Sequence, residues 1–156
     1  MITLVDKDFL KITADIDLTA LTVQIPLEVY DEELQKQIKE KPYLNKKRAI
    51  FNVFYENDQY CLLFEKGYRW DGATIPKGFR WIVGQKGDPC FLLASMVHDK
   101  LCEHHEFIKN NRYLSSLIFR ELLIACGVSE FKANIMFNAV DTFQKFLWKA
   151  QTKREG

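Results

Sequence analysis

Two short polar clusters lie in parts of the sequence that are otherwise apolar or rich in turn-forming residues. The first is the segment 70–76, which contains Asp71 and Thr74, and the second is the doublet of His98 and Asp99. Ionisable side chains in apolar surroundings are costly unless something pairs with them or binds them. Together the clusters offer two carboxylates, an imidazole and a hydroxyl, which suit a metal site or an acid–base site.

These four residues are the candidate site. As catalytic groups, Asp71 and His98 would form the reactive centre, Asp99 would orient the imidazole, and Thr74 would position substrate or water. As ligands, His98, Asp99 and Asp71 would hold a divalent metal ion. Neighbouring side chains of a helix point about 100° apart, so His98 and Asp99 can bind the same ion only if it lies at the edge of both side chains' reach. The alternative is that Asp99 binds something else, such as a loop amide.

A structural role for the same residues is the competing interpretation. An aspartate before glycine in a turn commonly accepts backbone N–H groups, and a histidine in an apolar helix is commonly a hydrogen-bonded core residue. If the loop folds over the helix, Asp71 reaches His98, and a carboxylate–imidazole pair would raise the imidazole pKa. Such a pair would act as a clasp between the loop and the helix.

Weaker candidates surround this site. His98, Cys102 and His105 share a helical stripe with ligand types that suit zinc, although His105 is expected beyond the helix end. Cys102 has a histidine nearby but no identifiable oxyanion donors, so it makes a poor nucleophile. The four cysteines lack C-x-x-C spacing and are predicted to be reduced, buried thiols: Cys61, Cys90, Cys102 and Cys126.

Charge and hydropathy restrict the function classes. The 156 residues include 22 Lys and Arg against 21 Asp and Glu, so a net charge of +1 argues against broad binding to nucleic acid or anionic membranes. No apolar run approaches the about 20 residues of a membrane span. Glycine-rich phosphate-binding patterns are absent from the sequence. We expect a cytoplasmic protein that does not bind membranes or nucleic acid.

The order of secondary structure predicts an α+β fold. Alternating residues predict strands, and a charged stretch at 31–41 predicts a short helix. Helical stripes predict three long helices, with N-caps at Asp88, Asn111 and Ser129 and with Gly127 in the left-handed position after the second. The strands are expected at 9–13, 21–26, 48–55 and 60–65, and the long helices at 89–104, 111–127 and 129–148. We therefore predict an N-terminal antiparallel β-sheet with a short inserted helix, packed against a C-terminal three-helix unit.

This arrangement predicts a single domain over residues 1–156. Residues 1–66 form its β-rich part, 67–88 a loop rich in glycine and aromatic residues, 89–150 its helical part and 151–156 a fraying tail. In the third long helix, apolar residues predict a buried stripe that includes Phe131, Met136 and Val140.

Three motifs in this order resemble a family of small phage and prophage proteins catalogued as a domain of unknown function. They are G-Y-R-W-D-G-A-T-I-P at 67–76, H-D-K-L at 98–101, and a capped helix ending at Gly127. The resemblance implies a phage or prophage origin, action in the host cytoplasm or in the virion, and no known reaction. It aligns Arg112 with a family arginine, but Ser115 and Ser116 stand where the family has Ala-Asp.

The His-Asp doublet is also similar to that of the metal phosphohydrolases named for this dipeptide. That family needs a histidine on an earlier helix, and no histidine precedes His98 in this chain. The missing ligand argues against the assignment.

Two functional hypotheses follow. The preferred one is a non-catalytic binding protein that acts on a phage or host protein, with Trp70, Phe79 and Trp81 or the helix at 31–41 as its contact surface. The alternative is a hydrolase, either metal-dependent or using Asp71 and His98 for acid–base chemistry. The sequence predicts neither the substrate nor the oligomeric state.

Overall fold

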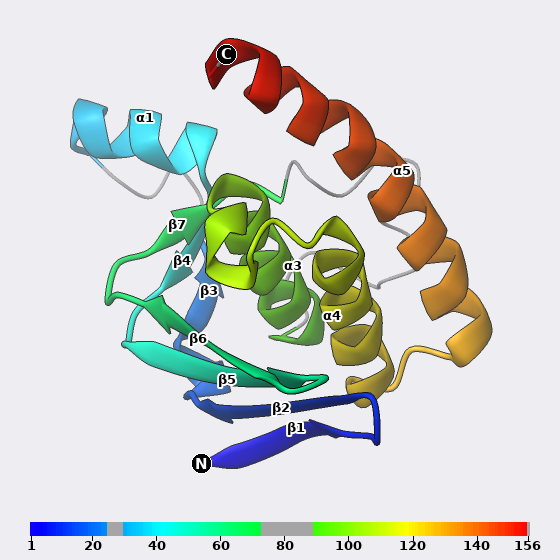
Figure 1. Cartoon of the computed structure of the whole chain (residues 1–156). Coiled ribbons are helices and arrows are strands. Elements are labelled where there is room, and N and C mark those ends of the chain that lie inside the picture. The colour runs from blue at the N-terminus through cyan, green and yellow to red at the C-terminus, as the bar shows by residue number, and fades with distance from the viewer. Residues whose placement is uncertain (25–29, 73–88, 156) are drawn as a thin grey trace. The chain divides into compact units, whose positions relative to one another are not determined.

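The computed structural model of the chain describes residues 1–24, 30–72 and 89–155, with only the backbone at residue 90 and at 147–155 (Figure 1). The described residues form two compact units. The N-terminal unit contains Met1–Asp71 and the start of helix α3 (Pro89–Glu103) as far as Leu93. The C-terminal unit contains Gly72 and the chain from Ala94 onward.

A four-stranded antiparallel sheet with strand order β1-β2-β5-β6 dominates the N-terminal unit (Figure 1). Its strands are β1 (Ile2–Asp6), β2 (Leu10–Asp15), β5 (Ala49–Tyr55) and β6 (Asp58–Phe64). Strands β5 and β6 each bury every second residue, which is the period of a strand with one face in the core. Glu56 and Asn57 connect them in a tight hairpin, with Tyr55 opposite Asp58. The strands predicted at 9–13, 48–55 and 60–65 are confirmed as β2, β5 and β6, whereas β1 was not predicted.

A second, three-stranded antiparallel sheet was not predicted. It consists of β3 (Leu21–Val23), β4 (Tyr43–Asn45) and β7 (Arg69–Trp70), with β4 in the centre. Strand β3 lies within the strand predicted at 21–26, but β4 and β7, with three and two residues, are too short to show the alternation on which the prediction relied. The sheet is stabilised by aromatic packing, because Trp70 is fully buried and its ring stacks on Tyr68 with centroids 6.0 Å apart.

The short helix of the N-terminal unit is confirmed as α1 (Glu32–Glu40). Asp31 is its N-cap, and its carboxylate accepts a hydrogen bond from the Leu34 amide at 3.0 Å. Only Ile38 of this helix is buried. A short 3-10 turn, η1 (Leu18–Ala20), leads into β3.

Helices make up the C-terminal unit. After α3 come the 3-10 turn η4 (His105–Ile108) and the helices α4 (Arg112–Ala125) and α5 (Glu130–Glu155), with α4 and α5 packed side by side (Figure 1). The predicted caps are confirmed. Asn111 accepts from the Leu114 amide, and Gly127 has φ +96°, which suits the left-handed position after a helix. Ser129 accepts from the Lys132 amide, whereas the predicted cap Asp88 lies outside the described residues.

Two predictions for α5 were wrong. Phe131 was placed on the buried stripe but is 75% exposed, while the buried stripe consists of Ala133, Met136, Val140 and Gln144. At about 100° per residue, Phe131 lies on the opposite side of the helix from that stripe. The helix also continues to Glu155, through the segment predicted to fray, since Ala, Gln, Lys, Arg and Glu are good helix formers.

The α+β prediction is confirmed: antiparallel sheets form from the N-terminal part of the chain and helices from the C-terminal part. The single-domain division stays a prediction. Among the described residues, no helix combines the length and the apolar character that crossing a membrane requires.

Candidate functional site

Asp99 is 1% exposed, and one of its carboxylate oxygens is engaged by a loop amide. The Gly72 N–H donates to Asp99 Oδ2 at 2.8 Å, within the C-terminal unit. Gly72 is buried and has φ +72°, a conformation that glycine adopts without a Cβ clash. The structure therefore shows the contact expected in the alternative interpretation, in which Asp99 binds a loop amide. The bond connects the end of the D-G turn to α3.

His98 is 1% exposed and lies against an aromatic ring. Its imidazole packs on Phe119 of α4, with ring centroids 4.8 Å apart and planes tilted by 46°. Burial lowers the pKa of His98 from 6.5 to about 3, because the charged ring would lose its hydration. The ring is therefore neutral at neutral pH, whereas a raised pKa was expected only for a ring paired with Asp71.

The described structure does not test whether the other predicted site residues meet this pair. Asp71 is half-buried at the end of the N-terminal unit, whereas His98 and Asp99 belong to the C-terminal unit. The pairing of Asp71 with His98 stays a prediction. Thr74 lies outside the described residues, and so do Phe79 and Trp81.

Trp70 was predicted as part of a contact surface, and this is wrong because the residue is fully buried. Its position in β7 explains the difference. The segment that was read as aromatic loop begins with a strand, and Trp70 lies opposite Tyr43 of β4 in the smaller sheet.

Cys102 is buried beside His98, but the two do not form a nucleophilic pair. The sulfur lies 4.0 Å from both ring nitrogens, so it faces neither nitrogen lone pair directly. Its short contact is with Gln144 of α5, whose Nε2 donates to Cys102 Sγ at 2.9 Å. A nucleophilic thiol needs a base that takes its proton, and His98, whose pKa burial lowers to about 3, is a weak base for a thiol. Cys102 therefore takes part in a polar contact between helices.

The prediction that all four cysteines are buried was wrong for two of them. Cys61 is exposed and Cys126 is partly exposed, while the side chain of Cys90 is not described. Cys61 alternates with Tyr60 and Leu62, which face the core, so the strand period turns it outward. No disulfide is present among the cysteines whose side chains are described.

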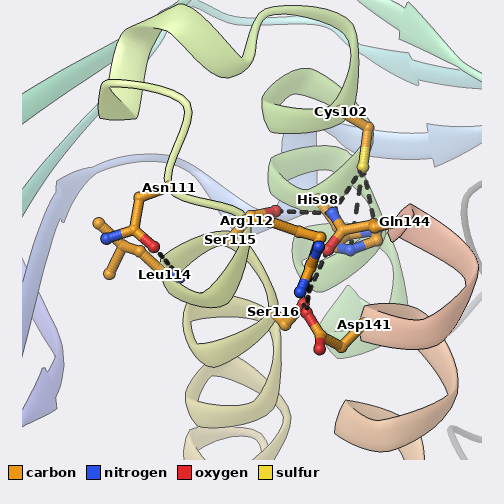
Figure 2. Close-up of polar contacts among 9 residues, drawn as sticks. All are labelled: His98, Cys102, Asn111, Arg112, Leu114, Ser115, Ser116, Asp141 and Gln144. Atoms are coloured by element: carbon orange, nitrogen blue, oxygen red, sulfur yellow. Dashed lines mark hydrogen bonds and ion pairs between the residues drawn. The ribbon is translucent and has the colours of Figure 1, made fainter. Parts of the chain in front are cut away.

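A chain of polar contacts that the sequence analysis missed runs between α4 and α5 (Figure 2). Gln144 Nε2 donates to Ser115 Oγ at 2.8 Å, and Ser116 Oγ lies 2.7 Å from Gln144 Oε1. Ser116 Oγ also lies 3.0 Å from Asp141 Oδ1, which accepts from Arg112 Nε at 3.2 Å. The signal in the sequence was the pair of serines inside an otherwise apolar helix.

The described residues contain no group of three His, Cys, Asp or Glu side chains that could hold a metal ion. The zinc stripe of His98, Cys102 and His105 is therefore not formed. As expected, His105 lies beyond the end of α3, in η4, where its Nδ1 is 2.5 Å from Asn110 Oδ1.

Comparison with known proteins places this site within a family. Residues 49–140, from the start of β5 into α5, match the family described as "Protein of unknown function (DUF1353)". The chain belongs to this family. The family match includes Asp71, Gly72, His98 and Asp99, and it leaves β1 to β4 and α1 outside its range.

One curated relative is the "Uncharacterized protein y4jT" of Sinorhizobium fredii, which is 34% identical over 87 residues. The aligned region covers 56% of this chain and 25% of the relative, so the chain spans about a quarter of that protein's length. No solved structure matches the chain.

The buried imidazole should make stability depend on pH in the acid range. The folded pKa is about 3 against 6.5 for an unperturbed histidine, so between these values the unfolded chain binds a proton that the folded chain does not. The free energy of unfolding should therefore fall as pH drops from 6.5 toward 3, by up to about 1.4 kcal/mol per pH unit. Urea unfolding of wild type and His98→Gln from pH 7.5 to pH 4 measures this, and the variant should show the flatter profile.

His104, which is exposed, provides the matched control. His104→Gln should keep the pH profile of the wild type. Parallel profiles for wild type and His98→Gln would contradict the assignment of the acid sensitivity to His98.

The carboxylate of Asp99 should contribute to stability through the Gly72 amide. Asp99→Ala leaves that buried N–H without its acceptor and should lower the free energy of unfolding by about 1–3 kcal/mol. Asp99→Asn keeps one acceptor oxygen and should lose less. Urea unfolding at pH 7 measures both. Glu103→Ala, at an exposed acid one turn further along α3, is the control and should stay within about 0.5 kcal/mol of wild type.

Proposed function

We propose that this chain is a small, non-catalytic binding protein of phage or prophage type. In this proposal the His98-Asp99 doublet is a structural clasp that holds the D-G turn to α3. The observation that carries the proposal is the burial of both side chains to 1%, with an Asp99 oxygen already bound by the Gly72 amide. A general acid or base must reach the proton that it transfers, and a sealed ring with a pKa of about 3 is poorly suited to that task.

The partner in this proposal is a phage or host protein, met in the host cytoplasm or in the virion. The proposed contact surface is α1, which carries one buried residue and otherwise exposed or half-buried side chains. Two observations support it. The helix has its own N-cap at Asp31, and it lies outside the part of the chain that matches the family. A segment added to a shared fold is a natural place for a specific contact.

A hydrolase is the second candidate. Here Asp71 and His98 would be the reactive pair, Asp99 would hold a divalent metal or orient the ring, and Thr74 would position substrate or water. The observation that favours it is Asp71, a half-buried carboxylate that directly precedes Gly72, the residue bound by Asp99. Solvent reaches this acid, unlike the two buried members of the set.

Metal titration separates the two candidates. Calorimetric titration of Zn²⁺, Mn²⁺ and Mg²⁺ into wild type and His98→Ala should give equal, negligible heats if the doublet is a clasp. His98→Ala should then lower the free energy of unfolding by about 1–3 kcal/mol, since a buried side chain that packs on Phe119 is lost, and Asp71→Asn should lower it as well if Asp71 pairs with His98. Saturable heats in wild type that vanish in variants of unchanged stability would instead establish the metal-dependent hydrolase.

The contact surface has its own test. A photocrosslinking side chain at Lys36, on the exposed side of α1, should give a discrete covalent adduct in phage-producing cells. The same group at Lys132, an exposed position on α5, is the control and should give none. Adducts of equal yield at both positions, or at neither, would contradict a binding role for α1.

A further inference from the structure

The interface between α4 and α5 combines apolar side chains with a small set of buried polar ones. On α5 the buried stripe begins with Ala133, Met136 and Val140 and then places Gln144, with no exposed surface, in the next position. On α4, Ser115 and Ser116 are also fully buried. Buried polar groups are costly unless they are hydrogen-bonded, so their partners restrict how the helices can pack.

Gln144 uses its amide to bridge three helices. Its Nε2 donates to Ser115 Oγ of α4 at 2.8 Å and to Cys102 Sγ of α3 at 2.9 Å, which uses both of its protons. Its Oε1 is 2.7 Å from Ser116 Oγ. Figure 2 shows the amide at the point where these three helices meet. Every polar atom of this side chain therefore has a partner on another helix.

The cluster continues toward solvent through Asp141, Ser116 and Arg112. Asp141 precedes Gln144 by three residues on α5, and it meets Ser116 at 3.0 Å and Arg112 at 3.2 Å. Ser116 has one hydroxyl proton, which it donates to Asp141 or to Gln144 but not to both at once. Since the Arg112 and Asp141 side chains are 35% and 20% exposed, the cluster runs from a half-buried ion pair into the core.

The apolar contacts alone allow more than one packing. Ala133, Met136 and Val140 recur every three or four residues, so a shift of α5 by one turn, about 5.4 Å, brings one apolar residue to the place of another. The same shift would separate Gln144 from Ser115, Ser116 and Cys102 and leave buried donors and acceptors without partners.

We infer that Gln144, Ser115, Ser116 and Asp141 form a register lock that selects one axial position of α5 against α4 and α3. A single buried polar residue is known to select register in coiled coils in this way, at some cost in stability. The inference concerns the packing of the C-terminal unit and does not depend on the proposed binding function.

The ring contact between Tyr113 of α4 and Phe137 of α5 reports the register. Their centroids are 5.7 Å apart and the rings meet edge to face, so a shift of one turn would separate them. The test variant combines Ser115→Ala, Ser116→Ala and Gln144→Leu, which removes the buried polar groups of the cluster and leaves the half-buried pair of Arg112 and Asp141. In NMR spectra it should remain helical but show duplicated or broadened α5 signals and a weakened cross-peak between the Tyr113 and Phe137 rings.

Met136→Leu is the matched control, because it changes an apolar residue of the same stripe and keeps every polar contact. It should give one set of signals with the cross-peak at wild-type intensity. Two outcomes would overturn the inference. One is a single sharp set of signals with the full cross-peak in the triple variant. The other is an unfolded triple variant, since the lock is inferred to select among packings that the apolar contacts can support.

Discussion

The cost of burying polar groups without partners is the constraint on which the C-terminal unit depends. Asp99, Ser115, Ser116 and Gln144 each have at most 1% of their surface exposed. Each meets a partner from a different segment of the chain: a loop amide for Asp99, and side chains of neighbouring helices for the others. These contacts are directional, so they specify the packing more narrowly than apolar contacts do.

Burial also determines the protonation state of His98 and the contacts of His98 and Asp99. In this chain both side chains are 1% exposed, and the lowered pKa of His98 keeps its ring neutral at neutral pH. Membership of a family described as of unknown function adds no reaction. Two adjacent residue types do not define the chemistry of a site, because the environment sets which protonation state and which contacts those residues have.

Local features were predictable because their causes are local. The strands β2, β5 and β6 follow from alternation, and α1 and α4 follow from capping residues whose side chains bond to amides three positions away. The glycine after α4 was assigned its left-handed conformation for the same reason. The candidate site was predictable to the same extent: Asp99 was placed correctly against a loop amide as one of two alternatives.

Contacts between distant segments were not predictable from these patterns. Phe131 and Met136 look alike in the sequence, and only packing against α4 shows that one is exposed and the other buried. Trp70 was read as a surface residue because β7 is two residues long and its partner, β4, precedes it by 26 residues. Gln144 carried no signal by itself, because its role comes from Ser115, 29 positions earlier.

The sequence by itself determined the α+β class, the positions of most helices and strands, and the two segments that carry the candidate site. These properties depend on side-chain period and on capping within a few residues, which a linear sequence records directly. Only the tertiary structure decided that His98 is buried and neutral, that Asp99 serves the Gly72 amide, and that a glutamine joins three helices. Whether a group is buried depends on all the segments that pack around it, and most of these are distant in the sequence. The loss of hydration that shifts a pKa therefore cannot be read from the neighbouring residues alone.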